Sequence, residues 1–437
     1  MKKFFLSVIV IGFMSCHPGQ KLVNNDLTLQ PAEYFYLDAE IESSGQTAED
    51  SDIEGKTFDQ LIESLYFDVE YRSFWFMEHI SYIMEDGVFE LPVAGATGYA
   101  AVELFLYTML NIDEEKDENE AEYEYEYEYE YEYEYDIFIL NPGQGFTILH
   151  EEGDWWFIEV DDITGWVMHK YCLINLPDII PSIIYDNTNT YYSLFRSSGV
   201  AIPYITGMAL YEGRDFNVRL ERHEYISAVL YSMAPKIFAA QQAALSQGNT
   251  LIIYEAFRPA EAHDELHKEF SYLIETNPYV MEGVTANSFN MIWFLAASPY
   301  NHQRGSAIDV SLGKITNWET KVTGNYTYIH ITGYSEYVMQ SPMHELSAIS
   351  AIYGPDIGSR SITAWRRALF SDKVTDGTLL LIKYCTDAEL TPLASEWWHF
   401  NDLESTEIAI EIESEGRYHI QNTYSRPPEQ LRYDPLY

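Results

Sequence analysis

Apolar and polar positions divide the second half of the chain into strands and helices. Residues 250–256, TLIIYEA, form an apolar run of strand length, which predicts a buried strand. Residues 307–312, AIDVSL, alternate after a polar loop and predict a second strand. Just before the first of these strands, residues 235–248 predict a helix, because Pro235 suits a first helical turn and Gly248 suits a helix stop.

The first half of the chain shows three other patterns. Residues 56–92 place apolar residues at loosely helical spacings and predict one or two short helices. Residues 122–135 alternate Glu and Tyr with the period of a strand, but seven like charges on one face oppose a strand, and a low-complexity loop is the interpretation that we favour. Residues 138–175 show short strands separated by turn residues, as in a small β-barrel.

Composition and charge narrow the class of protein. The chain has 437 residues, 47% of them hydrophobic, which is globular composition with room for two or three domains. The formal net charge of −44 would repel nucleic acid and anionic lipid, so neither is an expected partner. Much of the acidic excess lies in the first half, where residues 17–55 have the composition of an acidic linker.

The N-terminus has the pattern of an export signal. Two lysines precede the apolar run 4–14, which is too short to span a bilayer as a helix, and Ser15 and Cys16 follow it. Residues 1–16 resemble a bacterial lipoprotein signal, which implies lipidation of Cys16 and a location at the cell envelope or periplasm, with membrane contact only through the lipid. Cleavage without lipidation is the alternative.

Two separated motifs offer the ligands of a catalytic metal site. His302 and Asp309 stand seven residues apart where the loop enters the predicted strand, a weak signal when taken alone. His399 lies in the segment EWWHF, three residues after Glu396. A catalytic zinc ion needs three protein ligands and an open position, so these two histidines and Asp309 are candidate ligands.

Two further residues are candidates for the chemistry of peptide hydrolysis. Glu396 is the candidate base, because a carboxylate near zinc that is not itself a ligand can take a proton from water. Trp397 and Trp398 flank it and would exclude bulk solvent. Arg258 precedes Pro259 at the end of the predicted strand 250–256, where it could stabilise a developing oxyanion.

A second histidine pair is an alternative metal site that we disfavour. His263 and His267 stand four residues apart in a predicted helix and could face one zinc ion. The residue after His263 is Asp264, where the helical zinc-protease motif has Glu. Charged residues surround the pair on every side, so we interpret it as a solvated helix face.

Residues 93–175 resemble the bacterial SH3 family. The resemblance rests on a Gly-Asp-Trp-Trp strand at 153–156 and a Thr-Gly-Trp-Val strand at 164–167, with the Tyr-Glu repeat in a long early loop. The resemblance implies an all-β barrel that binds cell-wall peptide or another envelope partner. A purely structural spacer is the alternative, since a small barrel needs aromatic residues for its core in any case.

Residues 176–427, which precede a tail at 428–437, resemble the D-alanyl-D-alanine dipeptidases, zinc peptidases that share a fold with Hedgehog signalling domains. The matching motifs are LPDIIPSIIYDNTN, YEAFRP, HQRGSAID and EWWHF, in that order. The resemblance implies an α+β fold, Zn²⁺ bound by His302, Asp309 and His399, Glu396 as catalytic base and Arg258 as stabiliser of the transition state. It also implies D-Ala-D-Ala or a related peptidoglycan stem peptide as substrate.

Two departures from the dipeptidase pattern concern the substrate. Tyr300 stands where the family usually has Ser, and Val338 is expected at the position of an Asp that holds the substrate's amine, although Glu336 or Glu345 could replace that acid. An unpaired ammonium would be costly to desolvate. A D,D- or L,D-carboxypeptidase acting on longer stem peptides is therefore the alternative enzyme, and a catalytically silent wall-binding lipoprotein is the alternative outside enzymes.

Overall fold

The structure is a computed structural model and describes residues 90–107, 138–355, 357 and 361–428. These residues all fall within the unit Asp50–Tyr437. Several predictions concern residues wholly or mostly outside the described part: the signal 1–16 with Cys16, the linker 17–55, the helical segment 56–92, the repeat 122–135 and the tail 428–437.

The first sheet is antiparallel and contains most of the segment predicted to form a small barrel. Its strand order is β13-β7-β1-β4-β5-β6. Its strands are β1 (Thr97–Ala100), β4 (Gly145–Glu152), β5 (Trp155–Val160), β6 (Ile163–Met168), β7 (Cys172–Asn175) and β13 (Ala228–Leu230). The short strands predicted over 138–175 are confirmed, while the SH3-like barrel stays a prediction.

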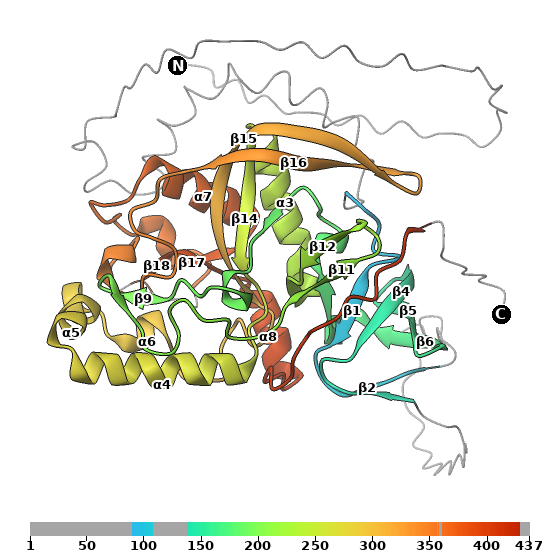
Figure 1. Cartoon of the computed structure of the whole chain (residues 1–437), viewed down its shortest axis with the longest axis horizontal. Helices are drawn as coiled ribbons and strands as arrows, with labels where there is room; N and C mark the ends of the chain where they lie inside the picture. The colour runs from blue at the N-terminus through green and yellow to red at the C-terminus, as the bar shows by residue number, and fades with distance from the viewer. Residues whose placement is uncertain (1–89, 108–137, 356, 358–360, 429–437) are drawn as a thin grey trace, which may run out of the picture. The chain divides into compact units, whose positions relative to one another are not determined.

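The second sheet carries the strands predicted in the second half. Its order is β17-β18-β15-β14-β8, and β16 pairs with β15. Its strands are β8 (Ile184–Tyr185), β14 (Asn249–Glu255), β15 (Ala307–Thr323), β16 (Tyr326–Glu336), β17 (Thr391–Leu393) and β18 (Glu396–Asn401). Every residue of β14 is buried, as its apolar run predicts, whereas β15 is continuously buried only over its first seven residues. Beyond them β15 and β16 leave the sheet as a long two-stranded ribbon (Figure 1).

The described residues also form six α-helices and three short strand pairs. The helices are α3 (Ala234–Leu245), α4 (Ala260–Thr276), α5 (Pro278–Thr285), α6 (Met291–Phe294), α7 (Asp376–Asp387) and α8 (Leu403–Glu411). The short pairs are β2 (Leu104–Phe105) with β3 (Ile139–Leu140), β9 (Arg196–Ser197) with β10 (Val200–Ala201), and β11 (Arg214–Asn217) with β12 (Arg222–Tyr225). α3 and α7 pack on each other and on β14, β15 and β18. The predicted helix over 235–248 is therefore confirmed as α3.

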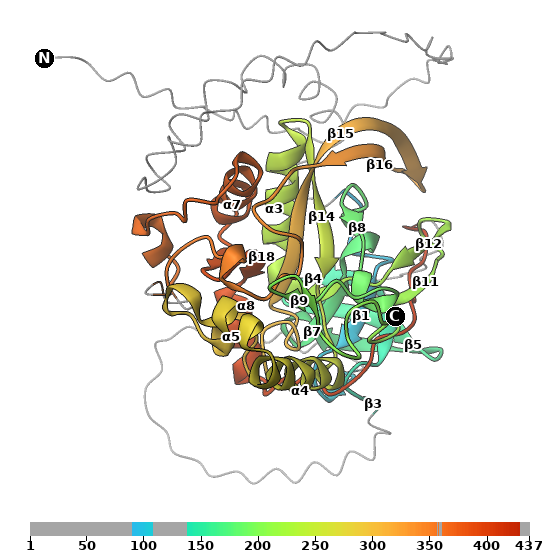
Figure 2. The same ribbon diagram turned by 60° about the vertical axis from the view of Figure 1, so that its left-hand side comes forward.

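One hydrophobic core joins the two predicted domains. β13 belongs to the segment after residue 176 but pairs with β7 of the barrel-like segment. The same buried cluster contains Ile148 and Trp156 from the first sheet and Ile253 from the second. Figures 1 and 2 show the two sheets side by side in both views. The two segments are therefore packed together, not held apart by a linker.

The described elements mix helices and strands, which is compatible with the predicted α+β class. The Hedgehog/DD-peptidase-like architecture stays a prediction. No helix among the described residues is long and apolar enough to cross a membrane. Cys172 in β7 and Cys385 in α7 are both buried and unpaired.

Candidate metal centre

Strand register places three acidic or imidazole side chains in one row. Glu255 ends β14 and pairs with Asp309 in β15, and Asp309 pairs with His399 in β18. Directly opposed residues on neighbouring strands hold their Cβ atoms about 5 Å apart. The row therefore crosses the centre of the second sheet, and the loop before β15 adds His302 to it.

The three predicted metal ligands form a nearly equilateral triangle of donor atoms. His302 Nε2 lies 3.1 Å from Asp309 Oδ1 and 3.1 Å from His399 Nδ1, and His399 Nδ1 lies 3.0 Å from Asp309 Oδ1. All three side chains are buried. These residues form a group that could hold a metal ion.

In each histidine, the ring nitrogen that points away from the triangle makes a hydrogen bond. That hydrogen bond determines which nitrogen carries the hydrogen and which has the free lone pair. His302 Nδ1 lies 2.7 Å from the carbonyl oxygen of Ala256, so it donates its hydrogen there. His399 Nε2 lies 2.9 Å from Asn401 Oδ1 and donates to it. The nitrogens that face the triangle therefore carry no hydrogen in the neutral rings. Three acceptor atoms about 3 Å apart could together hold a cation.

Burial and mutual charge set the ionisation of this group. Burial raises the pKa of Asp309, but His302 and the other histidines lower it more, and the result is a pKa well below the usual value. Burial lowers the pKa of His399. A charged carboxylate beside a neutral imidazole is the form that metal binding requires.

Glu396 lies at the edge of the triangle without joining it. Its Oε2 is 3.9 Å from His399 Nδ1 and its side chain is 6% exposed. Burial, followed by the charge of Asp309, raises the pKa of Glu396 well above its usual value, and Arg258 opposes the shift. The adjacent Trp397 and Trp398 are buried, as predicted. A carboxyl that readily holds a proton therefore stands next to the candidate metal position.

Arg258 completes the predicted set from the loop after β14. Its Nε and Nη2 both donate to Glu255 Oε2, and its Nη2 lies 3.5 Å from Asp309 Oδ2. Glu255 Oε1 in turn accepts from Tyr211 and Asn189, each at 2.7 Å. The structure thus brings Arg258 to the triangle and holds it there through Glu255.

Sequence analysis missed Glu255 and His344. His344 Nε2 lies 3.1 Å from Asp309 Oδ2, and its ring stacks on Phe195 with centroids 4.2 Å apart. His344, Asp309 and Glu255 form a second group that could hold a metal ion. The guanidinium of Arg258 already contacts the carboxylates of this second group, so its positive charge opposes a dication there.

The two predicted substrate-binding residues differ in position. Tyr300 is half-buried, and its ring centroid lies 6.0 Å from that of His399. The structure does not bring Val338 to the cluster, because its side chain is 82% exposed on the surface. His344, in the loop after β16, is the residue of this loop that reaches Asp309.

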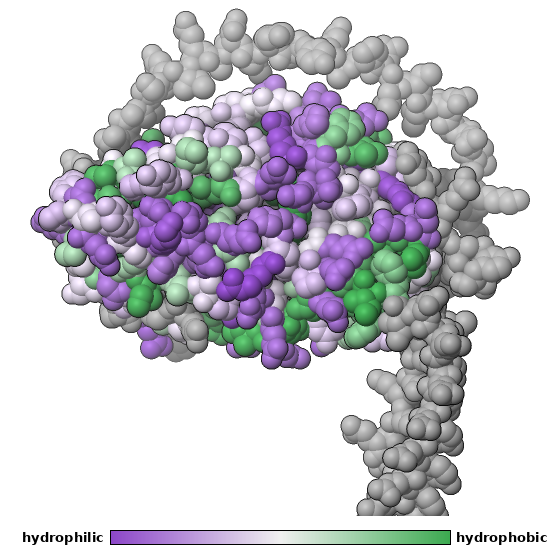
Figure 3. Space-filling view, turned by 60° about the horizontal axis from the view of Figure 1, so that its bottom comes forward, coloured by the Kyte–Doolittle hydropathy of each residue, from purple (hydrophilic) through white to green (hydrophobic). Residues whose placement is uncertain are grey.

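The interpretation of His263 and His267 as a solvated helix face is wrong for His263. Both lie in α4, but His263 is fully buried and only His267 is partly exposed. His263 Nδ1 lies 3.2 Å from Arg258 Nη1. The face of the molecule that includes α4 presents hydrophilic side chains and separate hydrophobic patches to solvent (Figure 3). Charged neighbours in sequence did not reveal that His263 points inward.

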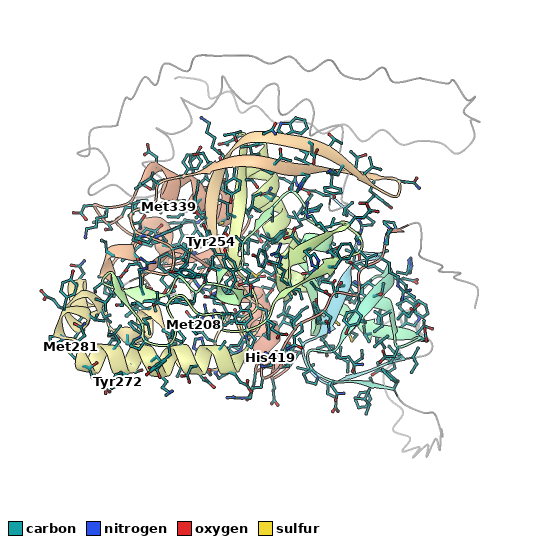
Figure 4. All side chains as sticks on the ribbon, in the orientation of Figure 1. Met208, Tyr254, Tyr272, Met281, Met339 and His419 are labelled. Carbon is teal, nitrogen blue, oxygen red and sulfur yellow. The ribbon has the colours of Figure 1, made fainter. Side chains whose placement is uncertain are left out.

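A groove of about 480 Å³ is lined in part by residues that are adjacent in sequence to residues of the site. Tyr254 precedes Glu255, Met343 precedes His344, and Trp397 follows Glu396. Figure 4 shows Tyr254 and Met339, which also lines the groove, close together on this part of the molecule.

The arrangement can hold one metal ion beside a carboxyl and a guanidinium, which suits hydrolysis of a polar bond. Comparison of the chain with protein-family models and with curated proteins gives no match.

Proposed function

We propose that this chain is a zinc-dependent peptidase that hydrolyses D-Ala-D-Ala or a related peptidoglycan-derived peptide. The observation that carries the proposal is the triangle of donor atoms from His302, Asp309 and His399, with Glu396 and Arg258 beside it. The four ordered sequence motifs supply the substrate class. An exported protein at the cell envelope, anchored through Cys16, would meet this substrate.

The donor set suits zinc. Two imidazole nitrogens and one carboxylate oxygen are common ligands of catalytic zinc. Tetrahedral ligands at about 2.0–2.1 Å from zinc stand about 3.3 Å from one another. The donor atoms here stand 3.0–3.1 Å apart, which leaves only a small adjustment. Three protein ligands leave a fourth position for water or substrate.

The chain's own residues have distinct parts in hydrolysis. When bound, zinc polarises a carbonyl group and makes water more acidic. Glu396 in its ionised form accepts the proton of the attacking water, and the raised pKa of its buried carboxyl suits it to return that proton to the leaving amine. Arg258 places a fixed positive charge near the developing oxyanion. Trp397 and Trp398 limit solvent around Glu396.

One feature favours the alternative of longer peptides as substrates. A free dipeptide needs a carboxylate to pair with its ammonium. Glu345 is buried and accepts hydrogen bonds from the Gly199 backbone and from Ser347, and Glu336 accepts from Tyr254. The loop brings an imidazole, that of His344, to the cluster where the dipeptidase pattern leads us to expect a carboxylate. This favours an uncharged amide nitrogen over an ammonium.

Metal analysis of the purified full chain tests the site. We expect about one equivalent of zinc in the wild type and none in His399→Ala, with loss of peptidase activity, because one of three ligands is gone. Glu396→Gln should keep zinc and lower kcat by about 100-fold or more, since proton transfer but not coordination is removed. His419→Ala, a change at a half-exposed histidine, is the control and should change neither value.

Zinc retained in His399→Ala would refute the site. Zinc binding without turnover on any stem peptide would instead support the silent wall-binding protein. Binding of insoluble peptidoglycan by that chain would then point to the SH3-like segment as the functional part.

Substrate choice is tested with free D-Ala-D-Ala and with longer stem peptides, or N-acetylated analogues, that end in D-Ala. We predict that kcat/KM for the acylated peptides is at least as high as for the free dipeptide, because the amide needs no ion pair. A chelator should abolish both rates. Hydrolysis of the free dipeptide alone would show that another acid holds the amine.

A further inference from the structure

We propose that His263 is a positioning residue for Arg258: its Nδ1 accepts a hydrogen bond from the guanidinium and keeps that group beside the metal cluster. The inference rests on the proposed function for the use of Arg258, but the contact itself can be tested separately. His263 was expected to be a solvated residue, and neither the motifs nor the dipeptidase resemblance gives it a part in the reaction.

The hydrogen bonds of His263 determine its tautomer. Its Nε2 lies 2.7 Å from the backbone carbonyl oxygen of Ala296, which can only accept, so Nε2 donates its hydrogen there. Nδ1 then has a free lone pair, and it lies 3.2 Å from Nη1 of Arg258. Burial, followed by the charge of Arg258, lowers the pKa of His263 to about 4, so the ring is neutral near pH 7.

His263 holds the part of the guanidinium that Glu255 leaves free. Glu255 accepts from Nε and Nη2 of Arg258, which fixes one edge of the planar group. The guanidinium carbon lies 5.0 Å from the ring centre of Phe195, which limits motion out of the plane. Nη1 is bound by His263 on the remaining side. Together these contacts set the direction in which Arg258 faces Asp309.

A neutral acceptor suits this position better than a further carboxylate. Glu255 and Asp309 already face the charge of Arg258. A third carboxylate would neutralise the guanidinium further and weaken its attraction for a developing oxyanion. A neutral imidazole supplies the geometry of a hydrogen bond and leaves the positive charge in place.

Tyr300 covers the other side of His263 and accounts for one departure from the dipeptidase pattern. The rings of Tyr300 and His263 stack with centroids 5.9 Å apart and planes at 26°. The ring of Tyr300 also lies against that of His399, with the two ring centroids 6.0 Å apart. A serine at position 300 would leave His263 uncovered. The large ring and the buried histidine therefore form one packed unit between Arg258 and a metal ligand.

The test compares His263→Leu, which keeps volume and removes the acceptor, with His263→Asn, whose Oδ1 can replace Nδ1. We expect His263→Leu to lower kcat by about tenfold with little change in zinc content or KM, since a hydrogen bond to a charged group is lost. His263→Asn should recover most of that loss. In an Arg258→Gln background, His263→Leu should have no further effect. Equal loss in both backgrounds, or no recovery by Asn, would overturn the proposal.

A measurement without turnover separates this inference from the proposed function. Imidazole ¹⁵N NMR of the full-length wild type should show a hydrogen on His263 Nε2 and none on Nδ1, and the Nδ1 resonance should shift in Arg258→Gln. A hydrogen on Nδ1, or an unchanged resonance in a folded Arg258→Gln variant, would refute the contact. If the wild type hydrolyses no peptide, the proposed function fails while this spectrum still decides the role of His263 toward Arg258.

Discussion

The two carboxylate oxygens of Asp309 face different residues of the candidate metal centre. Oδ1 faces His302 and His399, and Oδ2 faces His344 and Arg258. One oxygen is thus available to a metal ion while the other is held by hydrogen-bond donors. Such outer contacts orient a ligand, and their loss typically weakens metal binding by about 10- to 100-fold.

His344 should therefore influence metal affinity without binding the metal. We predict that His344→Leu weakens zinc binding by about tenfold or more, because Asp309 loses a donor that orients it. His344→Gln, which can still donate to Oδ2, should lose less. Competition with a chromophoric chelator measures the affinity. His330→Leu is the control, since His330 is a partly buried histidine that bonds Arg222 and not the cluster.

The opposite result is equally informative. Complete loss of zinc in a folded His344→Leu variant would make His344 a ligand, and an unchanged affinity in both variants would leave its contact with Asp309 without a function.

Sequence motifs predicted residues that the structure brings together, but not the residues that orient them. His302, Asp309, His399, Glu396 and Arg258 stand in short ordered motifs, and the structure brings them together. The orienting residues depend on tertiary packing, which leaves no local period. Glu255 was visible as a carboxylate at a strand end inside YEAFRP. His263 and His344 had no such signal.

At the scale of the element, the loop that carries His302 is held against the first sheet at Gly305. Gly305 has φ of 68°, and an added Cβ would lie 2.5 Å from Leu173 Cδ2 and 3.0 Å from the backbone nitrogen of Leu230. The carbonyl of Gly305 also accepts from that nitrogen at 2.8 Å. The loop therefore has little freedom to move away from β7 and β13.

We predict that Gly305→Ala destabilises the fold by about 2–4 kcal/mol, because backbone strain adds to a clash with atoms that cannot easily shift. Gly248→Ala is a matched control: Gly248 has φ of 73°, and an added Cβ meets nothing within 4 Å. It should lose only about 1 kcal/mol. Urea unfolding measures both, and equal losses would show that φ alone matters at Gly305.

Strand positions were predictable from the period of apolar residues, but strand lengths were not. The prediction for 307–312 covers only the buried start of β15, which continues to Thr323. The later residues pair with β16 and are mostly exposed, so no apolar alternation marks them. Backbone pairing within the ribbon, and not burial, extends these strands.

At the scale of the whole molecule, the barrel-like segment and the peptidase-like segment are structurally dependent. β7 pairs with β13, and the hydrophobic core runs through both sheets. The two family resemblances meet near residue 176, but a resemblance in sequence does not show how segments pack. The boundary between the two resemblances is therefore not a boundary between separately packed domains.

We predict that a chain lacking residues 1–175 does not unfold cooperatively, because β13 and the core lose their partners. Deletion of 122–135 is the contrasting variant. Leu106 N donates to the Phe138 carbonyl at 3.0 Å, so the ends of that connection already meet. Its deletion should leave melting and zinc binding unchanged. Calorimetry compares the two, and a cooperative, zinc-binding 176–437 fragment would contradict the prediction.

The end of the described chain lies against its beginning, and this affects when the protein can fold. Tyr424 N donates to Thr97 Oγ1, Thr147 donates to the Tyr424 carbonyl, and Arg426 N donates to the Gly95 carbonyl. The first sheet therefore lacks these partners until the ribosome has made residues 424–426. A newly made chain spends that interval with Gly95, Thr97 and Thr147, on and beside the central strands β1 and β4, still without these hydrogen bonds.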